Sequence, residues 1–527
     1  MTSGANETMT ATEASREARF AIEVGAEPLS IDDIIALAEG VAVPQLSGAA
    51  RSRMQASADL IARLHEDETN IYGVTTSVGA SVGTHVPRLF SRDLSLNIQR
   101  MHGCGTGQLL SEEQTAAALA VRLSSLSQGK SGVRPVVAER LIDFLANRVL
   151  PLIPSEGSVG ASGDLTPLSY VAAALVGERE VRFDGEVVEA SQALEAIGEA
   201  PLALGPREVL ALMNGTSVAT AIACLGWARA RQLSRLAACL TAMCSEVVHG
   251  NPSHFDAFVH DAKPHPGQVL AARWIREDLG YDGTGTRAGV RLQDRYSIRC
   301  APHVIGVALD SLRWSQAALE TELNGVSDNP LVDLEAGRVV HGGNFYGGHV
   351  GFACDTLKVA VANIACLLDR QLTLLCNPAE NDGLPANLVG VQEAQACSHN
   401  GFKAVTIAAS ALAAEALKMT IPASAFSRST EQHNQDKVPM ATLAARDLAR
   451  VVEITEQVAA MMTLACCQAV DLRDDALKFS ERTSAMRSAV REVVPTLGPD
   501  RRMDVDIAAV LGLVRGHSLP HGSDALT

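Results

Sequence analysis

The chain has 527 residues, enough to bury a large apolar core, and its low aromatic content of 4% with abundant Ala and Leu favours closely packed helices. Its formal net charge of −16 is spread along the sequence without a run of Lys and Arg, which argues against nucleic acid and anionic membrane surfaces as partners. Charged residues interrupt the most apolar stretches, so we expect none of them to cross a bilayer.

Cysteine usage and the N-terminal sequence favour a cytoplasmic protein. The eleven cysteines include no Cys-x-x-Cys pair and most lie in apolar stretches, which is typical of small buried side chains in a reducing compartment. Residues 1–19 are polar and lack a basic start followed by an apolar run, which predicts a disordered tail and not an export signal.

The first predicted elements are two helices and a polar loop. Ser30 and Asp33 form a capping pattern before a periodic apolar run, and a second helix is expected over residues 49–65. Residues 72–85 are rich in Gly, Thr and Ser and have few apolar side chains to pack. This composition makes the segment a candidate lid.

Helical spacing of apolar residues dominates the rest of the chain. Shorter helices are expected over residues 111–126, 136–147 and 209–225. The alternating segment 179–188, with Asp184-Gly185 at its centre, predicts a β-hairpin. Long segments suited to a helix bundle cover residues 227–248, 303–323, 349–375, 395–419 and 441–469. We therefore predict a mainly α fold, with an N-terminal domain over residues 20–220 and a long-helix bundle with C-terminal helices over residues 221–527.

Residues 157–169 read Gly-Ser-Val-Gly-Ala-Ser-Gly-Asp-Leu-Thr-Pro-Leu-Ser and carry the most distinctive chemistry of the chain. If the backbone nitrogen of Gly163 attacks the carbonyl of Ala161 and two waters leave, the tripeptide closes to a 4-methylidene-imidazol-5-one and Ser162 becomes an exocyclic methylidene. The glycines permit the tight backbone that this closure needs, and the Asp164 carboxylate lies where it could assist the dehydrations. The ring would be an electrophile made from the chain itself.

Five further motifs accompany this segment. They are Tyr72-Gly73-Val74-Thr75-Thr76, Met213-Asn214-Gly215-Thr216, Tyr296-Ser297-Ile298-Arg299-Cys300, Gly343-Asn344-Phe345 and the run Glu-Gln-His-Asn-Gln-Asp over residues 431–436. In this order they resemble the aromatic amino acid lyase family, which includes histidine, phenylalanine and tyrosine ammonia-lyases and 2,3-aminomutases. The resemblance covers about residues 31–511 and implies a carbon–nitrogen lyase whose smaller domain carries the cyclised loop above a helix bundle. It implies no metal and no dissociable cofactor.

The resemblance also implies a mechanism. Addition of the substrate amine to the methylidene improves a poor leaving group while a base takes a β-proton. Tyr72 matches the family's base, although a phenol with a reference pKa of ~10 needs nearby positive charge or hydrogen bonds to act near neutrality. Arg299 matches the group that binds the substrate carboxylate, for which a guanidinium fork is suited.

Other matched residues are expected around the ring and the substrate. Asn214, Gln293 and Tyr296 would border the ring and polarise its carbonyl. Asn344 would help to bind the carboxylate, and Phe345 would wall the ring. The remaining expected substrate contacts are Leu165, Asn434 and Gln435.

Glu415 lies sixteen positions before Glu431, an offset at which the resemblance places a carboxylate facing the substrate amine. A carboxylate in so apolar a helix needs a charged or hydrogen-bonded partner, and a bound ammonium would serve. The alternative is a salt bridge to a neighbouring chain.

The pair Met101-His102 is expected to touch the substrate side chain, because the family places its selectivity pair there. The imidazole can hydrogen-bond a phenol or another imidazole, while Met101 also admits phenylalanine. The motif over residues 431–436 is more similar to phenylalanine and tyrosine enzymes than to histidine enzymes. We therefore expect L-tyrosine or L-phenylalanine to give coumarate or cinnamate, with histidine, giving urocanate, as the alternative.

The lid departs from the family at Ser77-Val78, where Gly-Phe is usual. A lid that stays shut would retain ammonia long enough for its re-addition at the β-carbon, so a 2,3-aminomutase remains open.

Other classes fit the sequence less well. The glycines of residues 103–107 do not match a nucleotide-binding loop, and Gly160-Ala-Ser-Gly163 does not match a hydrolase elbow. Histidines between residues 249 and 265 are spaced by five or six positions and do not share one helix face, as metal ligands would. A non-enzymatic helical scaffold would leave Ser162 unmodified.

Members of the family are homotetramers whose active sites take residues from three chains. Apolar helices such as the one expected over residues 395–419 agree with that assembly, because a monomer would expose much of their surface. Tyr72, Arg299 and Glu415 then need not lie in one subunit.

Overall fold

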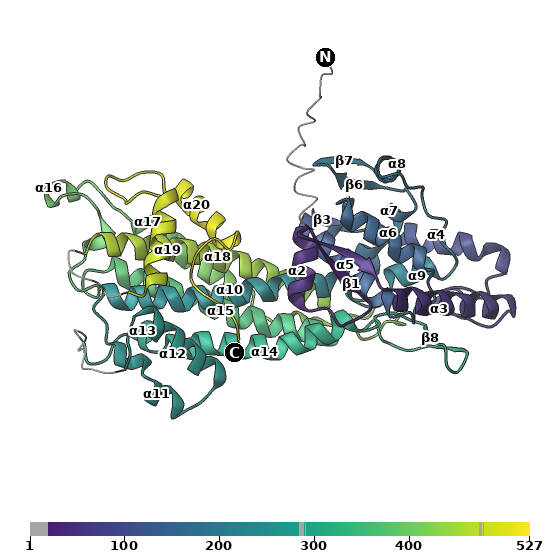
Figure 1. The fold of residues 1–527 in the computed structure, drawn as a ribbon, viewed down its shortest axis with the longest axis horizontal. Helices are drawn as coiled ribbons and strands as arrows, with labels where there is room; N and C mark the ends of the chain where they lie inside the picture. The colour runs from purple at the N-terminus through teal and green to yellow at the C-terminus, as the bar shows by residue number, and fades with distance from the viewer. Residues whose placement is uncertain (1–18, 284–288, 290, 474–476, 478, 527) are drawn as a thin grey trace, which may run out of the picture. The chain divides into compact units, whose positions relative to one another are not determined.

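The computed structural model describes residues 19–283, 289, 291–473, 477 and 479–526 (Figure 1). The chain divides into two compact units. The first unit comprises Met1–Leu225, Ala317–Ala353 and Pro422–Arg446, and the second comprises Gly226–Gln316, Cys354–Ile421 and Asp447–Thr527. The predicted tail over residues 1–19 lies outside the described residues except for Arg19, which donates to the carbonyl of Ala146.

Helices dominate the first unit. They are α2 (Ile31–Glu39), α3 (Gly48–Glu66), α4 (Ser91–His102), α5 (Glu112–Ser127), α6 (Pro135–Ala146), α7 (Leu165–Leu175), α8 (Ala190–Ala196) and α9 (Glu208–Met213), with short 3-10 turns η1 (Gly79–Ser81), η2 (Arg88–Phe90) and η5 (Ala423–Phe426). Ser30 caps α2 and exchanges hydrogen bonds with Asp33, as its capping pattern predicts.

Small sheets complete the first unit. β1 (Phe20–Val24) pairs in parallel with β2 (Ala42–Leu46), and the other pairs are antiparallel. These pairs join β3 (Thr106–Leu109) to β5 (Pro154–Glu156), β6 (Glu180–Phe183) to β4 (Leu150–Pro151) and β7 (Glu186–Glu189), and β8 (Leu331–Asp333) to β9 (Arg338–Val340). The hairpin predicted around Asp184-Gly185 is confirmed, and both residues have the positive φ of a two-residue turn, 49° and 83°.

Four long helices have residues in both units and match predicted segments: α10 (Ser217–Val247), α14 (Ala301–Asn324), α15 (Gly348–Cys376) and α18 (Ala441–Asp471). The second unit adds α11 (Ala257–Asp261), α12 (Pro266–Asp278), α13 (Tyr296–Arg299), α16 (Glu393–Ala396), α17 (Lys403–Lys418), α19 (Glu481–Val493) and α20 (Met503–Arg515), with η3 (Pro252–Phe255) and η4 (Ala386–Leu388). The predicted mainly α fold is confirmed.

The helix predicted over residues 209–225 is wrong in its continuity. α9 ends at Met213 and α10 begins only at Ser217. The buried Arg122 guanidinium binds the carbonyl of Asn214 at 2.9 Å, and Gly215 has a φ of 150°. The intervening turn therefore replaces helical hydrogen bonds with contacts to Arg122.

The helix predicted over residues 395–419 also starts too early. The Asp500 carboxylate accepts the backbone N–H groups of Asn400 and Gly401 at 2.7 and 2.9 Å, and Gly401 is left-handed with a φ of 51°. α17 therefore begins only at Lys403.

By length and composition α15 is apolar enough to cross a membrane, contrary to the sequence-based expectation. However, 72% of its most apolar window is buried, and the buried Lys358 lies 2.8 Å from Asp355 and 3.0 Å from Asp447. The burial and ion pairing of α15 are typical of a core helix.

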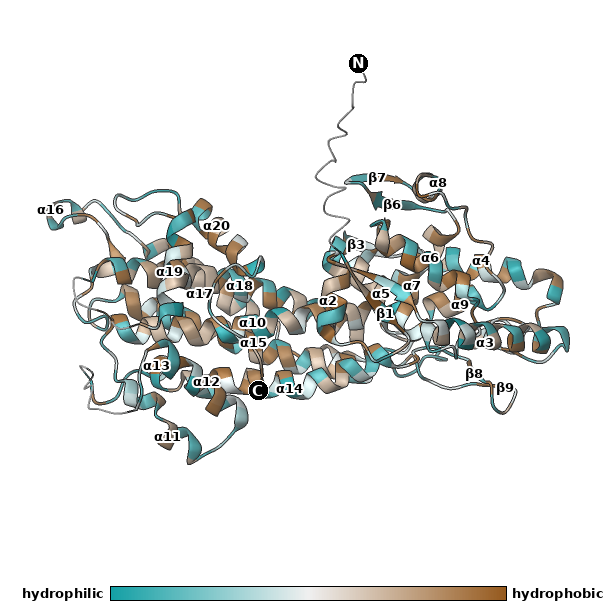
Figure 2. Cartoon of the chain, in the orientation of Figure 1, coloured by the Kyte–Doolittle hydropathy of each residue, from teal (hydrophilic) through white to brown (hydrophobic). Residues whose placement is uncertain are grey.

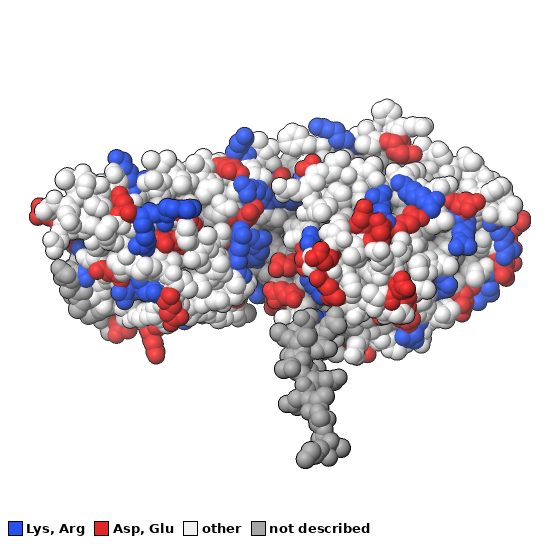
Figure 3. Space-filling view, turned by 90° about the horizontal axis from the view of Figure 1, so that it is seen from above, with Lys and Arg blue, Asp and Glu red and all other residues white. Residues whose placement is uncertain are grey.

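Figure 2 shows the hydropathy of each helix, and Figure 3 shows acidic and basic side chains interspersed on the visible surface.

Candidate active site

The Ala-Ser-Gly loop, which we define as residues 157–164, lies between β5 and α7. Gly160 and Gly163 both have left-handed φ values, 72° and 70°. Ala161 and Gly163 form a β-bridge across Ser162, so the chain turns tightly at the serine. A Cβ added to Gly163 would lie 2.1 Å from the carbonyl oxygen of Gly215. The loop therefore requires glycine at position 163.

Asp164 is held at the end of this loop by hydrogen bonds. Its side chain accepts the backbone N–H groups of Val218 and Ala219, both at 2.8 Å, at the start of α10. The other carboxyl oxygen accepts the Thr442 hydroxyl at 2.6 Å. Burial raises the pKa of Asp164 to about 6 against the opposing effect of these hydrogen bonds. The carboxyl can thus exchange a proton near neutrality.

Asn214 lies in the turn that packs against the loop. Its side-chain nitrogen donates to the carbonyl of Asn329 at 3.0 Å. Its side-chain oxygen is buried and has no hydrogen-bond partner within the described part of the chain. That oxygen is available to a donor on a ligand or a modified loop.

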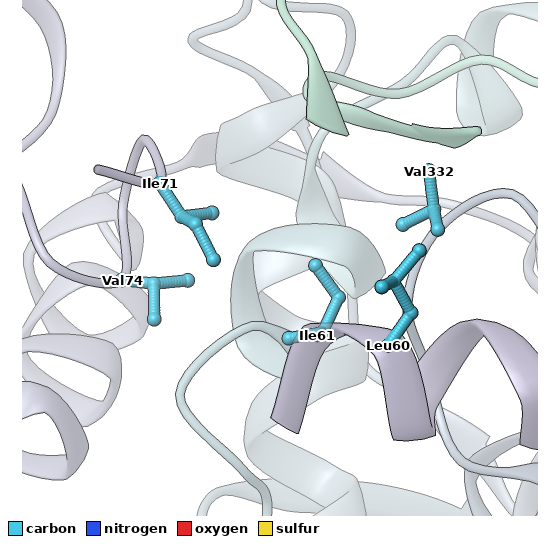
Figure 4. Close-up of a cluster of buried hydrophobic side chains, with 5 residues drawn as sticks. All are labelled: Leu60, Ile61, Ile71, Val74 and Val332. Carbon is cyan, nitrogen blue, oxygen red and sulfur yellow. The ribbon is translucent and has the colours of Figure 1, made fainter. Parts of the chain in front are cut away.

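The candidate lid is anchored at its start. Figure 4 shows Val74 with Ile71, packed toward Leu60 and Ile61 of α3 and Val332 of β8. These five side chains are at most 7% exposed. The expectation that this segment has too few apolar residues to pack is therefore wrong for its first residues.

The Tyr72 hydroxyl lies inside the candidate lid, where it accepts the backbone N–H of Gly79 at 2.7 Å. The Glu431 carboxylate accepts the N–H of Ala80 at 2.8 and 2.9 Å. Burial raises the pKa of Tyr72; the Gly79 hydrogen bond lowers it, and the charge of Glu431 raises it. Within the described chain this environment opposes ionisation of Tyr72, so a base role needs additional positive charge.

Residues 430–435 form a tight turn beside the lid. Glu431, Gln432 and His433 are all left-handed, with φ values of 50°, 54° and 65°. The Gln435 side-chain oxygen accepts the Thr430 hydroxyl at 2.8 Å, so the other end of its amide is an NH₂ donor. The predicted contact Asn434 is exposed in this turn.

The predicted selectivity pair ends α4. Met101 is 58% exposed, whereas His102 is half-buried. The Nδ1 atom of His102 lies 2.8 Å from the carbonyl oxygen of Ile98, which can only accept a hydrogen bond. Nδ1 therefore carries the proton, and Nε2 of neutral His102 is an acceptor.

Three other predicted residues of the first unit are half-buried or exposed. Leu165 is half-buried as the first residue of α7. Asn344 is exposed, its side chain 3.5 Å from the carbonyl of Val326, and Phe345 is half-buried.

In the second unit, α13 brings Tyr296 and Arg299 together. The Arg299 guanidinium carbon lies 4.6 Å from the centre of the Tyr296 ring. Among the described residues no carboxylate pairs with Arg299, and its Nε atom is buried without a hydrogen-bond partner. Tyr296 and Gln293 are exposed. Arg299 is therefore a cation oriented by an aromatic face and open to an external carboxylate.

Glu415 lies on the exposed face of α17 in the second unit. Its carboxylate accepts hydrogen bonds from Arg450 at 2.9 and 3.3 Å. This ion pair joins two residues of one chain, whereas the alternative predicted from the sequence, a salt bridge to a neighbouring chain, stays a prediction. The ion pair is exposed, so it stabilises the fold by little.

The structure thus assigns the predicted residues to two units. The first unit holds Tyr72, Met101, His102, Ala161, Ser162, Gly163, Leu165, Asn214, Asn344, Phe345, Asn434 and Gln435, and the second holds Gln293, Tyr296, Arg299 and Glu415. Sequence reasoning missed Glu431 as a partner of the lid, although the residue stood in a recognised motif. The sequence showed only a carboxylate in a short polar motif before α18. Its spacing did not link Glu431 to Ala80 of the candidate lid, 351 positions away.

A separate hollow lies on α3 and α6 of the first unit and contains none of the predicted residues. Its two arginines are engaged in ion pairs, Arg51 with Glu139 and Arg134 with Glu208. Its lining includes the carboxylates of Asp59 and Glu139 but no residue of the Ala-Ser-Gly loop.

Comparison with known proteins gives close relatives over almost the whole chain. A histidine ammonia-lyase of Bradyrhizobium diazoefficiens is 36% identical over 508 residues, which are 95% of this chain and 96% of that protein. An MIO-dependent tyrosine 2,3-aminomutase of Streptomyces globisporus is 36% identical over 94% of this chain and 96% of its own. The crystal structure of a histidine ammonia-lyase from Trypanosoma cruzi has a TM-score of 0.87 at 32% identity, covering 95% and 94% of the two chains.

The relatives carry different substrate names but share one fold, and the family model for aromatic amino acid lyases matches residues 29–492. With the motifs and the glycine-dependent loop in the same chain, this match shows that the protein belongs to the aromatic amino acid lyase family and is a carbon–nitrogen lyase or an aminomutase.

Proposed function

We propose that the chain is an ammonia-lyase that converts L-tyrosine, L-phenylalanine or both to coumarate or cinnamate and ammonia. The reaction removes the α-ammonium group and one β-proton and leaves a carbon–carbon double bond. The observation that carries the proposal is the Ala-Ser-Gly loop, with its left-handed glycines and the bridge between Ala161 and Gly163.

This loop fits the cyclised 4-methylidene-imidazol-5-one. The bridge across Ser162 supports the approach of the Gly163 nitrogen to the Ala161 carbonyl, and Asp164 supplies a carboxyl with a pKa of about 6 beside it. The unpartnered oxygen of Asn214 provides a buried acceptor in the packed turn. When formed, the ring supplies an electrophile for the substrate amine; no metal or dissociable cofactor is proposed.

The chain's own side chains bind the substrate and move the proton. Arg299 binds the substrate carboxylate, and the Tyr296 ring, whose centre lies 4.6 Å from the guanidinium carbon, adds a cation–π contact. Tyr72 takes the β-proton as a phenolate. Since its surroundings raise its pKa, the positive charge of bound substrate or of a second copy's guanidinium is needed to ionise it. Asn344 and Gln293 assist binding, and Phe345 and Leu165 wall the site.

His102 supports a phenolic substrate. Its Nε2 atom is an acceptor, so it can accept a hydrogen bond from the hydroxyl group of tyrosine. Gln435 presents an amide donor where a histidine enzyme would have a carboxylate in the resembling motif. Met101 provides an adaptable apolar wall that also admits phenylalanine.

Histidine is the second candidate substrate, with urocanate as the product. It is favoured by the 36% identity to a histidine ammonia-lyase, and an imidazole N–H could also donate to His102. The equal identity to a tyrosine 2,3-aminomutase favours tyrosine and keeps migration of the amine as an alternative to its release.

A competition assay tests these proposals. Purified protein is incubated with equal concentrations of L-phenylalanine, L-tyrosine and L-histidine, and all products are resolved by chromatography and mass. Coumarate or cinnamate with free ammonia supports the proposal. Urocanate would show that histidine is the substrate, and β-amino acids would show that the enzyme is an aminomutase. If none of the three amino acids gives a product, the non-enzymatic scaffold is the remaining alternative.

We propose that the active enzyme is a homotetramer with composite sites. The exposed face of α17 carries Ala404, Ile407, Ala411 and Leu417 beside Glu415, an apolar surface suited to burial against a second copy. In such an assembly Glu415 would exchange its exposed pairing with Arg450 for a position near the substrate amine.

Mixed assemblies test the composite site. Tyr72→Phe and Arg299→Ala are each inactive by this proposal, but their co-expression recovers part of the activity if the two residues of one site come from different chains. No recovery in mass-verified mixed tetramers would place both residues of a site in one chain.

The cysteines support a reducing compartment, and we propose the cytoplasm. All eleven are free thiols, and burial raises the pKa of Cys224 and of Cys239 to about 12. Such thiols are inert and need no oxidising environment.

A further inference from the structure

A chain of short contacts in the first unit links Glu322, near the end of α14, to the peptide of Asn344. The Glu322 carboxyl lies 2.5 Å from the Thr216 hydroxyl, which lies 3.1 Å from the Ser327 hydroxyl. The Ser327 hydroxyl in turn lies 3.2 Å from the carbonyl oxygen of Asn344. Thr216 and Ser327 are buried, whereas Glu322 is half-buried and Asn344 is exposed, so the middle contact is shielded from water and the two outer contacts are shielded in part.

The three contacts need three protons, but the two hydroxyls supply only two. The Asn344 carbonyl can only accept, so its proton comes from Ser327. Ser327 also receives the backbone N–H of Thr216 at 3.0 Å, and the contact between the two hydroxyls must use the Thr216 proton. Glu322 then has a hydrogen bond to Thr216 only if its own carboxyl is protonated. Ionised Glu322 would leave one of the three contacts without a proton.

The surroundings of Glu322 agree with this count. Burial raises the pKa of Glu322, and the nearby Asp164 carboxyl raises it further, while the Thr216 hydroxyl and His349 oppose the shift. Burial is the largest of these effects.

Thr216 belongs to the turn on which the Ala-Ser-Gly loop rests. Gly215 forms a β-bridge with Gly163, and its carbonyl accepts the N–H of Asp164 at 2.7 Å. The next residue, Thr216, contacts Glu322, so two adjacent residues connect Glu322 to the loop. At the other end of the contacts lies Asn344, which the proposed function places at the substrate carboxylate.

We propose that Glu322 is a neutral carboxylic acid in the folded enzyme and a positioning residue, whose proton donated to Thr216 holds both the 214–216 turn and the Asn344 peptide in place. Its role in turnover rests on the proposed function, whereas its protonation does not. The negative charge of a glutamate is not used at this position.

Substitutions separate a neutral donor from a carboxylate. Glu322→Gln keeps an N–H donor toward Thr216, so kcat should stay within about threefold of wild type. Glu322→Ala and Thr216→Val remove one partner and should lower kcat by about 10- to 100-fold with a smaller change in KM. Thr216→Ser keeps the hydroxyl and should behave as wild type, which provides a second pair if a Glu322 variant fails to fold.

Infrared spectroscopy tests the protonation directly. The full-length protein, labelled with ¹³C-glutamate, should show at neutral pH the carbonyl stretch of a protonated carboxylic acid. Glu322→Gln should lose this band, and Glu335→Gln, an exposed matched control in the turn between β8 and β9, should keep it.

A spectrum unchanged by Glu322→Gln, or a Glu322→Gln enzyme as impaired as Glu322→Ala, would overturn the inference. A wild-type protein that shows the band but makes no product would support the protonated Glu322 and overturn the proposed function instead.

Discussion

The Ala-Ser-Gly loop and the predicted substrate contacts differ in how the chain holds them. Asp164, at the end of the loop, is 1% exposed and accepts three hydrogen bonds, and Gly163 packs directly on Gly215. By contrast Tyr296 is 71% exposed and Met101 is 58% exposed. The Ala-Ser-Gly loop is thus held by contacts inside one unit, whereas these two predicted substrate contacts are exposed side chains.

The largest effect is expected at the centre of the buried region. Ser162→Ala removes the oxygen whose loss creates the methylidene, so kcat should fall by roughly 10⁴-fold or more. Steady-state kinetics measure the loss, and Ser155→Ala in β5 serves as a control that should leave activity near wild type. Near-normal turnover of the Ser162 variant would remove the ring from the mechanism.

Tyr72→Phe tests whether the proposed base can be removed without affecting the buried Ala-Ser-Gly loop. The substitution deletes the proposed base but leaves the loop untouched, so kcat should fall by about 10²- to 10⁴-fold while the absorbance of the ring persists. Ultraviolet difference spectra and product assays on one preparation separate the two effects. An active variant would exclude Tyr72 as the base.

Asp164→Asn tests the raised pKa of Asp164 in the buried region through the pH dependence of the free energy of unfolding. A raised pKa means that native Asp164 keeps a proton that the unfolded chain releases, so its contribution to stability is present below about pH 4 and lost by about pH 6. This difference is worth up to about 3 kcal/mol. The wild-type free energy of unfolding should therefore fall more steeply across this window than that of the variant. Parallel curves in urea titrations would contradict the raised pKa.

Arg299→Lys tests the exposed region. A lysine keeps the charge but loses the planar fork and its contact with the Tyr296 ring, so kcat/KM should fall by about 10- to 100-fold. The ring absorbance should be unchanged, because the loop belongs to the other unit. Wild-type kcat/KM would show that another cation binds the carboxylate.

The smallest effect is expected for His102→Phe. Loss of the Nε2 acceptor should shift the ratio of tyrosine to phenylalanine turnover toward phenylalanine by roughly tenfold. Competition with both substrates in one reaction gives this ratio. If the ratio does not move, the selectivity contact lies elsewhere.

Local sequence patterns predicted much of the fold. The Ser30 cap, the hairpin at Asp184-Gly185 and the long helices follow from capping, turn chemistry and apolar periodicity, which act over a few residues. The break at residues 214–216 could not be predicted in this way, because its cause is the guanidinium of Arg122, 92 positions away.

The candidate site shows the same limit. Motifs identified Ser162 and Tyr72 as candidates, but not the contact of Glu431 with the lid or the proton count at Glu322. Both depend on side chains brought together by tertiary packing. The raised pKa of Tyr72 was also invisible to spacing, since it arises from burial and from the charge of Glu431.

The most direct test is an intact-mass and peptide-mass measurement on the purified protein. We expect the peptide spanning residues 157–169 to be lighter than its sequence by two waters, and the Ser162→Ala protein, which cannot form this ring, to lack the loss. A wild-type peptide of unmodified mass would show that Ala161-Ser162-Gly163 never cyclised and would exclude the ring from the mechanism.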